Sequence, residues 1–311
     1  MKVFHSCTSE YWFVALAIGD KCYSNFELFC LPFALQYCIN NNINLACVTS
    51  DIFDADTASC ISGKKKTWQK FLIPQLIFKK YPTAKLVCYF DSDILFNPYA
   101  GSIFSLASHD VISLVSMKHN LPYDDFFCRK TISFLRNRYY SSDYPLDSAI
   151  FMSYDDIYRY HGFKVFDDFA CAGLFVCPKQ FASNLSMIYY KYDIHNNSLT
   201  SGGDQPAFNF EIRSNFPVGN LPYSCQALWS WEMAHRYRHL YTSSSLKDIN
   251  NAITSTLLSN LALHFAGSWP DSRMYMNTSL FSYVYNQENL EFFRYLSLQP
   301  QGIPLGTIKS P

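Results

Sequence analysis

The sequence has no surplus of charge of either sign, because 25 lysine and arginine residues balance 25 aspartate and glutamate residues. Its longest basic run is the lysine triplet at 64–66. Proteins that bind nucleic acid need a basic stripe or patch that matches the phosphate backbone. We therefore expect no nucleic-acid partner, and we interpret the triplet as a solvated loop ahead of a helix.

Disulfide and zinc-ribbon patterns are also lacking. The 11 cysteines are scattered, odd in number and contain no C-x-x-C pair. A disulfide framework or a zinc ribbon would need cysteines paired at short, regular spacings. The pattern is typical of reduced, mostly buried thiols, so we expect a cytoplasmic protein.

No apolar run has the character of a membrane span. The run 12–18 follows Glu10 and is followed by Asp20 and Lys21, so we interpret it as a buried strand rather than a signal peptide. The uncharged stretch 29–50 is long enough to cross a bilayer, but Pro32 and the asparagine triplet after it interrupt the stretch. It predicts a helix, a turn and a strand instead, and we expect no transmembrane anchor.

The chain does contain enough apolar residues for a large core, since 49% of its 311 residues are hydrophobic. Apolar strands alternate with helical patterns, which favours an α/β fold with an open sheet and helices on both faces. The expected strands are 12–18, 43–48, 86–90, 111–115, 173–177 and 261–265. The expected helices are 24–40, 67–80, 179–192, 204–212 and 280–296.

Two of these helices carry local boundary signals. The segment 24–27 matches a capping box and predicts that a helix begins at Ser24. Thr67 is the expected N-cap of the next helix, and Pro74 is expected to kink it. The chain loses its periodicity at 117–166, where we expect loops and short helices.

The motif with the clearest chemistry is Asp91-Ser92-Asp93, directly after the third strand. Ligands of open α/β sheets gather outside the carboxyl ends of the strands. Residues two apart in an extended chain point to the same side, so both carboxylates can approach one ion. Carboxylate oxygens suit Mn²⁺ or Mg²⁺, and an ion with open positions can take diphosphate oxygens.

Taken alone, the motif has two other interpretations. Aspartates that bracket a turn are commonly turn formers or caps. A phosphatase of the haloacid-dehalogenase type also places two such aspartates after a strand, with the first, here Asp91, as nucleophile. Such enzymes usually use the first strand of the chain and a hydroxyl residue after the second aspartate, whereas here the strand is the third and Ile94 follows.

The wider pattern resembles a known family. The block Trp68-Gln69-Lys70-Phe71, the strand 86–90 and the segment 91–95 are similar to the core of GT-A glycosyltransferases, especially the group of glycogenin and the bacterial galactosyl- and glucosyltransferases. Three further segments follow in the family's order, at 172–176, 203–209 and 264–267. The resemblance covers residues 12–270.

The resemblance implies a GT-A fold, which is Rossmann-like with a mixed, mostly parallel open sheet. It implies metal-dependent transfer of a hexose from a nucleotide diphosphate sugar, with a UDP-sugar favoured and a retaining outcome. The acceptor would be a glycan, a lipid-linked glycan or a glycolipid. Since the sequence has no repeat and no clear linker, we expect one domain over 1–275, with the irregular segment 117–166 as a lid or acceptor region and the helix and tail of 276–311 packed on it.

The resemblance also implies site residues. Asp91, Asp93 and His264 would bind Mn²⁺ or Mg²⁺, and Asp204 and Gln205 would contact the donor sugar and act in catalysis. The remaining contacts with the nucleotide sugar would come from Ala17, Tyr23, Lys70, Ala172, Gly173 and Gly267, besides Asp91. From the residues alone, Asp204 could equally cap a helix, and both His264 and Tyr23 could be core residues.

The chain departs from the family's pattern at several positions. Cys171 stands where the family often has asparagine, and Pro206 stands where a second acid is common. The usual Lys-Pro-Trp after the late histidine is absent, and Arg273 is the candidate to replace its positive charge. In an inverting variant, Asp167, Asp168 or Asp204 could serve as general base.

These departures leave room for a catalytically weak or inactive sugar-nucleotide or glycan-binding module as the alternative to an enzyme. The oligomeric state is left open. For a lipid-linked acceptor, the protein would work at the inner face of a membrane. The aromatic segment 117–166 and the final helix would then make a peripheral contact with that surface.

Overall fold

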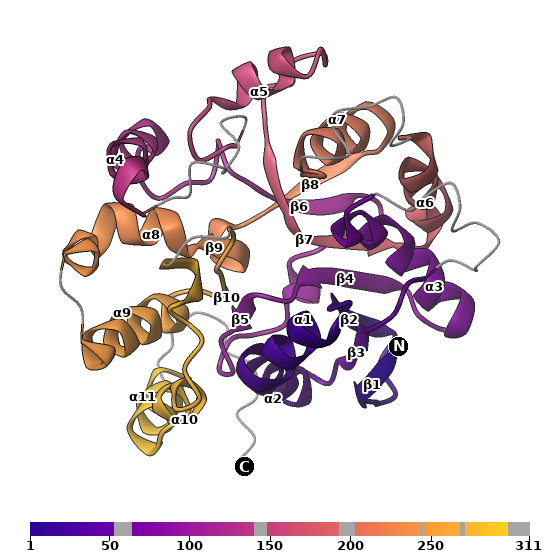
Figure 1. Ribbon diagram of the computed structural model, residues 1–311. Helices are drawn as coiled ribbons and strands as arrows, with labels where there is room; N and C mark the ends of the chain where they lie inside the picture. Colours follow the sequence, from indigo (N-terminus) through magenta and orange to yellow (C-terminus); the bar gives the residue numbers. More distant parts are fainter. Residues whose placement is uncertain (53–63, 140–147, 193–202, 243–244, 268–270, 298–311) are drawn as a thin grey trace.

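The computed structural model describes residues 1–52, 64–139, 148–192, 203–242, 245–267 and 271–297. Its centre is a seven-stranded sheet with the order β1-β3-β2-β4-β7-β6-β8 (Figure 1). Along the chain these strands are β1 (Lys2–His5), β2 (Tyr11–Leu16), β3 (Asn44–Val48), β4 (Leu86–Asp91), β6 (Ile112–Ser116), β7 (Ala170–Pro178) and β8 (Val218–Leu221).

The sheet is mixed, and the predicted α/β fold class with an open sheet is confirmed. Strands β3, β2 and β4 run parallel to one another, and β6 runs parallel to β8. Strand β7 runs antiparallel to both β4 and β6, and β1 runs antiparallel to β3. Parallel and antiparallel pairings are therefore equally common in the described sheet, which is less parallel than expected.

Helices cover both faces of the sheet, as the apolar strands predict (Figure 1). Alternate residues of β2 belong to two separate cores, with Phe13 on one face and Val14 on the other. The first core includes residues of α2 (Leu31–Asn41) and α9 (Leu246–Leu258). The second includes residues of α3 (Ile73–Lys80), α6 (Ala182–Lys191) and α7 (Gln205–Asn215). A fully buried large apolar side chain stabilises the fold by roughly 1.5–3 kcal/mol, so the helix layers on both faces contribute to the stability of the sheet.

A second, three-stranded sheet has the order β5-β10-β9. Strand β5 (Ile94–Phe96) follows β4 after a two-residue turn and pairs antiparallel with β10 (Ala262–His264). Strand β9 (Ala227–Leu228) pairs parallel with β10. The sequence predicted β10 but neither β5 nor β9, because strands of two or three residues have no readable periodicity.

The predicted starts of two helices were wrong. Helix α1 (Asp20–Asn25) begins before Ser24, because Gly19 has a φ of +95° and lets the chain turn directly after β2. A π-helical turn at Phe26–Cys30 joins α1 to α2. Pro74 lies in the first turn of α3, where its missing N–H costs nothing, so it starts that helix instead of kinking it. Thr67 lies inside a 3₁₀ helix that precedes α3, and so it is not an N-cap.

The segment 117–166 contains more helix than predicted. Helix α4 (Asp125–Tyr139) packs on α8 (Trp229–Arg236), and α5 (Tyr154–Tyr160) follows. Buried residues of α4, α5 and α8 form a third core. The described 3₁₀ helices are Lys66–Leu72, Ile103–Ser105, Lys179–Phe181, Tyr223–Gln226, Arg238–Tyr241 and Asp271–Arg273.

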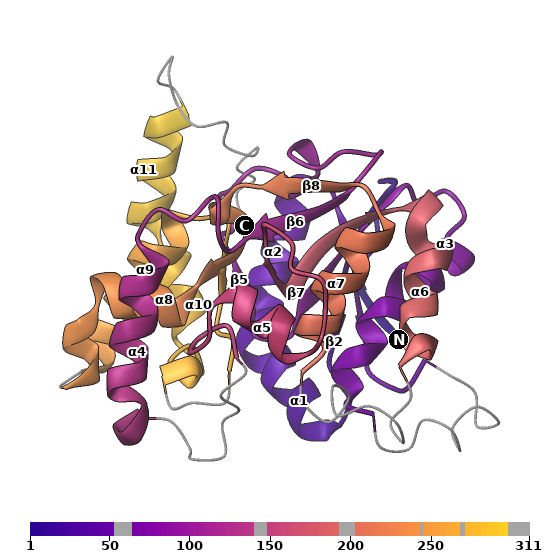
Figure 2. The same cartoon turned by 90° about the horizontal axis from the view of Figure 1, so that it is seen from above.

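The single final helix that was expected is two helices, α10 (Leu280–Val284) and α11 (Gln287–Ser297), which lie beside α9 (Figures 1 and 2). Asn286 separates them, and its side chain accepts a hydrogen bond from the Asn289 N–H at 2.8 Å. Phe293 of α11 stacks on Tyr99 with ring centroids 4.8 Å apart. The predicted tail lies outside the described residues. No described helix combines the length and the apolar character needed to cross a membrane.

Candidate functional site

Three side chains that the sequence singled out meet where the two sheets join. One ligand atom each of Asp91, Asp93 and His264 lies within 4.8 Å of the other two. His264 Nε2 is 3.2 Å from Asp93 Oδ1 and 3.8 Å from Asp91 Oδ2. The β5–β10 ladder causes this meeting, because it sets His264 opposite Ile94, and the Phe265 N–H donates to the Asp93 carbonyl at 3.0 Å.

The donor set fits a hard divalent cation. Two carboxylates and a neutral imidazole suit Mn²⁺ or Mg²⁺. An octahedral ion with bonds of about 2.1 Å places its ligand atoms about 3 to 4.2 Å apart, close to the spacing found here. The carboxylate side chains of Asp91 and Asp93 are 27% and 29% exposed, so an ion bound to them would keep positions open toward solvent.

Asp91 is held from the protein side by two buried groups. The Tyr89 hydroxyl donates to Asp91 Oδ1, as two residues on one face of β4 can. Burial and the Asp91 carboxylate raise the pKa of Tyr89 well above its usual value, so its hydroxyl stays a donor. Lys70 Nζ lies 3.5 Å from the same oxygen. These contacts orient Asp91 and leave Oδ2 toward His264.

Lys70 forms a buried ion pair with Asp204, which the family resemblance placed in the site. The distance between Lys70 Nζ and Asp204 Oδ2 is 2.8 Å, and Lys70 also donates to the Ala172 carbonyl at 3.0 Å. Burial alone would lower the pKa of Lys70, but Asp204 and Asp91 outweigh it and raise the pKa. Burial raises the pKa of Asp204, while Lys70 opposes that rise. Although Asp204 precedes α7, its side chain makes no capping hydrogen bond.

Gly173 leaves the space that the cluster occupies. A Cβ atom on Gly173 would lie 2.4 Å from His264 Cε1 and 2.8 Å from Asp91 Oδ2. Real Cβ atoms do not approach other atoms so closely. The family resemblance implied that Gly173 contacts the nucleotide sugar. The structure shows that β7 can pass behind the carboxylates because residue 173 has no side chain.

A cavity of about 530 Å³ opens beside Asp93. The cationic side chains in its lining are Lys21, at the start of α1, and Arg273. Gly267 lines it at a φ of +113°, and its carbonyl accepts from the Ser272 hydroxyl at 2.8 Å. Asp20 and Asp93 are the carboxylates of the lining, so a divalent cation at Asp93 would give the pocket the net positive charge that suits a polyphosphate. Sequence reasoning missed Lys21, although it follows a strand end where ligands gather.

The two residues expected near the base and ribose do not line this cavity. Ala17 is buried, and its N–H donates to the Val48 carbonyl at 2.9 Å. The Tyr23 hydroxyl donates to Glu27 at 2.5 Å, and Lys2 Nζ lies over its ring. Their contact with a nucleotide stays a prediction.

Gln205 is the first residue of α7, and its side chain lies near Ala170, the first residue of β7. Its Nε2 is 3.4 Å from the Ala170 carbonyl and 3.7 Å from Met117 Sδ. Asn209, one turn further along α7, accepts from the Ala170 N–H at 2.6 Å and donates to its carbonyl at 2.8 Å. The role of Gln205 in catalysis stays a prediction, and Asn209 anchors β7 where the strand enters the site.

The other candidate general bases are already paired. Asp168 accepts from Ser116 Oγ at 2.6 Å and from Arg213 at 2.9 Å. Asp167 accepts from Lys118 at 2.8 Å.

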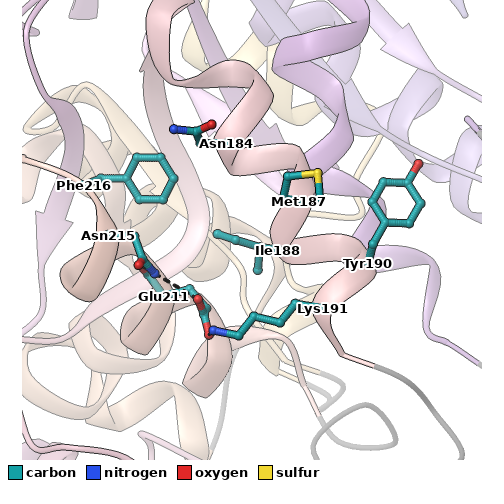
Figure 3. Close-up of a pocket in the computed structure, with 8 residues that line it drawn as sticks. All are labelled: Asn184, Met187, Ile188, Tyr190, Lys191, Glu211, Asn215 and Phe216. Atoms are coloured by element: carbon teal, nitrogen blue, oxygen red, sulfur yellow. Dashed lines mark hydrogen bonds and ion pairs between the residues drawn. The ribbon is translucent and has the colours of Figure 1, made fainter.

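A second cavity, of about 570 Å³, lies between α6 and α7 (Figure 3). Its acid and its base, Glu211 and Lys191, pair with each other at 2.7 Å, and Asn215 donates to Glu211 at 3.0 Å. None of the predicted site residues lines this cavity. Because Lys191 is paired with Glu211, this cavity suits a phosphate group less well than the cavity beside Asp93 does.

The sequence matches no protein-family model and no curated protein. Among solved structures, a glycosyltransferase involved in glycosylation of the major capsid of PBCV-1 is 9% identical over 88% of this chain and 100% of its own, with a TM-score of 0.48. The bifunctional glycosyltransferase WbbM is 13% identical over 94% of this chain and 52% of its own, with a TM-score of 0.49. The galactosyltransferase LgtC, in complex with donor and acceptor sugar analogs, is 13% identical over 91% and 99%, with a TM-score of 0.43.

Proposed function

We propose that this chain is a metal-dependent glycosyltransferase that moves a sugar from a nucleotide diphosphate sugar to a glycan acceptor. One observation carries the proposal: the cluster of Asp91, Asp93 and His264 adjoins a cavity that Lys21 and Arg273 also line. A diphosphate in that cavity would meet positive charge from the metal and from the two cations. Such an arrangement stabilises charge that develops on a leaving diphosphate.

The residues around the cavity would bind the metal and the diphosphate. Asp91, Asp93 and the neutral His264 would hold the cation, which supplies Lewis-acid stabilisation of the leaving diphosphate when bound. Lys21 and Arg273 would bind phosphate oxygens, and Gly267 would let the backbone approach them. Reducing the barrier by about 2.7 kcal/mol corresponds to a hundredfold in rate.

The motif resemblance supports a hexose donor, with a UDP-sugar favoured and Mn²⁺ as the ion. A retaining outcome is supported by the state of the other carboxylates, because Asp168 is bound to Arg213 and Asp204 to Lys70. The acceptor would be a glycan, a lipid-linked glycan or a glycolipid.

The test is donor hydrolysis across a panel of nucleotide sugars, with and without Mn²⁺. Hydrolysis of one donor should require the metal and should fall at least about a hundredfold in Asp93→Ala. Asp110→Ala, which changes an exposed aspartate away from the cluster, is the matched control and should keep full activity. Lys21→Gln and Arg273→Gln should raise the KM for the donor.

Three results would refute or redirect the proposal. Equal hydrolysis in Asp93→Ala would refute it. Metal-dependent nucleotide binding without turnover over hours would instead favour an inactive binding module. Hydrolysis of a simple phosphate ester, with a trapped aspartyl-fluoride complex at Asp91, would favour a phosphohydrolase.

A further inference from the structure

Gln226 contacts His264 on the side of the ring that faces away from Asp93, and no sequence motif includes it. It is the last residue of the 3₁₀ helix that precedes β9, and it is 1% exposed. One end of its amide is 3.1 Å from His264 Nδ1, the ring nitrogen that faces away from Asp93. The same amide also reaches the backbone of β7 at Cys171 and Leu174.

The hydrogen-bond partners of the amide favour one placement of its oxygen over the other. With the oxygen toward His264, it accepts from the Leu174 N–H at 3.1 Å and from His264 Nδ1 at 3.1 Å, while the NH₂ donates to the Cys171 carbonyl at 3.3 Å. With the opposite orientation, oxygen would face a carbonyl and NH₂ would face an N–H. Only the first orientation satisfies every group, and a buried polar group without a partner costs about 1–3 kcal/mol.

This orientation determines how the imidazole is presented. Since Gln226 Oε1 can only accept, the Nδ1 of His264 must carry a proton. In a neutral ring, Nε2 is then the nitrogen with a free lone pair, and it faces Asp91 and Asp93. An amide makes this contact without adding a third negative charge behind the two carboxylates.

We propose that Gln226 is a positioning residue, which fixes the ring orientation and tautomer of His264 so that Nε2 is presented to a divalent cation. The inference rests on the proposed metal site. Outer groups that bind the second nitrogen of a ligating histidine change metal affinity by about 10–100-fold. The competing neighbour is the Cys171 thiol, 3.5 Å from Nδ1. A thiol is a weak hydrogen-bonding partner, so it should contribute much less than the amide.

Two variants of Gln226 and one control variant separate the contribution of the Gln226 amide from that of the Cys171 thiol. Gln226→Leu removes the acceptor, whereas Gln226→Glu keeps an acceptor for Nδ1–H but loses the donor to the Cys171 carbonyl. Cys171→Ala is the matched control because it removes the other neighbour of Nδ1. The affinity of the purified protein for Mn²⁺ is measured from the paramagnetic resonance signal of the free ion, and melting in a chelator checks that each variant folds.

Mn²⁺ affinity should fall about 10–100-fold in Gln226→Leu, should be partly retained in Gln226→Glu, and should change less than about threefold in Cys171→Ala. A second measurement does not depend on the variants. In wild-type protein with ¹⁵N-labelled histidine and Zn²⁺ as a diamagnetic probe, the signal of His264, assigned by its loss in His264→Gln, should show a protonated Nδ1.

The outcomes that overturn the inference differ from those that overturn the proposed function. If wild type binds Mn²⁺, Asp93→Asn does not, and Gln226→Leu binds as wild type does, the inference alone is wrong. A proton on Nε2 in the Zn²⁺-loaded protein also overturns it. If wild type binds no Mn²⁺, both the proposed metal site and the inference are overturned.

Discussion

Replacing Lys70 with methionine tests whether the buried ion pair holds the site together. Lys70 is 2% exposed and lies 2.8 Å from Asp204 and 3.5 Å from Asp91. Methionine fills similar volume but leaves Asp204, 7% exposed, without its counter-charge. Breaking a buried pair by removing one partner costs about 3–5 kcal/mol. At about 2.1 cal/mol/K per residue, unfolding 311 residues carries an entropy near 0.65 kcal/mol/K, so Tm should fall by about 5–8 °C.

The control lies in the same 3₁₀ helix. Lys66 pairs with Asp51 at 2.7 Å, but the two side chains are 54% and 37% exposed. Exposed pairs contribute about 0–1 kcal/mol, so Lys66→Met should lower Tm by less than about 2 °C. The double variant Lys70→Met/Asp204→Leu removes both charges and should recover part of the loss, because no charge is left buried and unpaired.

The loss in Lys70→Met should also depend on pH. Without Lys70, the pKa of Asp204 rises further above its unfolded value, so the folded state binds a proton that the unfolded state releases. The free energy of unfolding of the variant therefore falls as pH rises through that window, and the loss should be larger at pH 8 than at pH 5. Thermal unfolding followed by circular dichroism gives both comparisons. Equal shifts in Lys70→Met and Lys66→Met, or a double variant less stable than Lys70→Met, would refute the reasoning.

Two further predictions concern the neighbourhood of the site. Gly173→Ala should abolish Mn²⁺ binding, because its Cβ would collide with His264 and Asp91; Gly219→Ala, whose Cβ would meet the Val111 side chain at 2.6 Å, should lower Tm yet bind Mn²⁺ normally. Burial raises the pKa of Asp271 from its unfolded value of 3.8 to about 6. Relative to neutral pH, the carboxyl therefore stabilises the fold fully below pH 3.8, and this stabilisation is lost as pH rises through 6. Asp271→Asn should therefore be more stable than wild type at pH 7.5, by up to roughly 3 kcal/mol at about 1.4 kcal/mol per unit, and equal to it below pH 4 in urea unfolding. A gain that persists at pH 4 would contradict this assignment.

The sequence predicted the central layers because their signals are local. Apolar runs such as 12–18 and 86–90 are long enough to read, and Asp91 could be placed at a strand end without knowing any contact. The elements that the sequence did not predict are those whose formation depends on tertiary contacts. Strand β5 has three residues, and its pairing with β10 connects positions that lie far apart in the chain.

In the candidate site, too, some residues could be predicted from local motifs and others could not. Asp93 and His264 could be proposed from motif order, because each follows or ends an apolar strand. Lys21 and Gln226 could not, because a lysine two residues after a glycine and a glutamine before a short strand are common and form no motif. Only the fold brings Gln226 to 3.1 Å from His264 and places Lys21 in the cavity beside Asp93.

The charges of the site give an independent reason to expect a cation there. Lys70 lies closer to Asp204 than to Asp91, so its single charge is shared between two carboxylates, while Asp91 Oδ2 and Asp93 face the ring of His264. Burial of His264 opposes a charged ring, yet Cys171 and Asp93 outweigh it and raise the pKa of His264 well above its usual value, which shows how negative the surroundings of the ring are. A dication bound by Asp91, Asp93 and Nε2 of His264 would neutralise both carboxylates. The site is therefore built for more positive charge than its side chains supply, and a diphosphate would bring the negative charge that Lys21 and Arg273 are placed to meet.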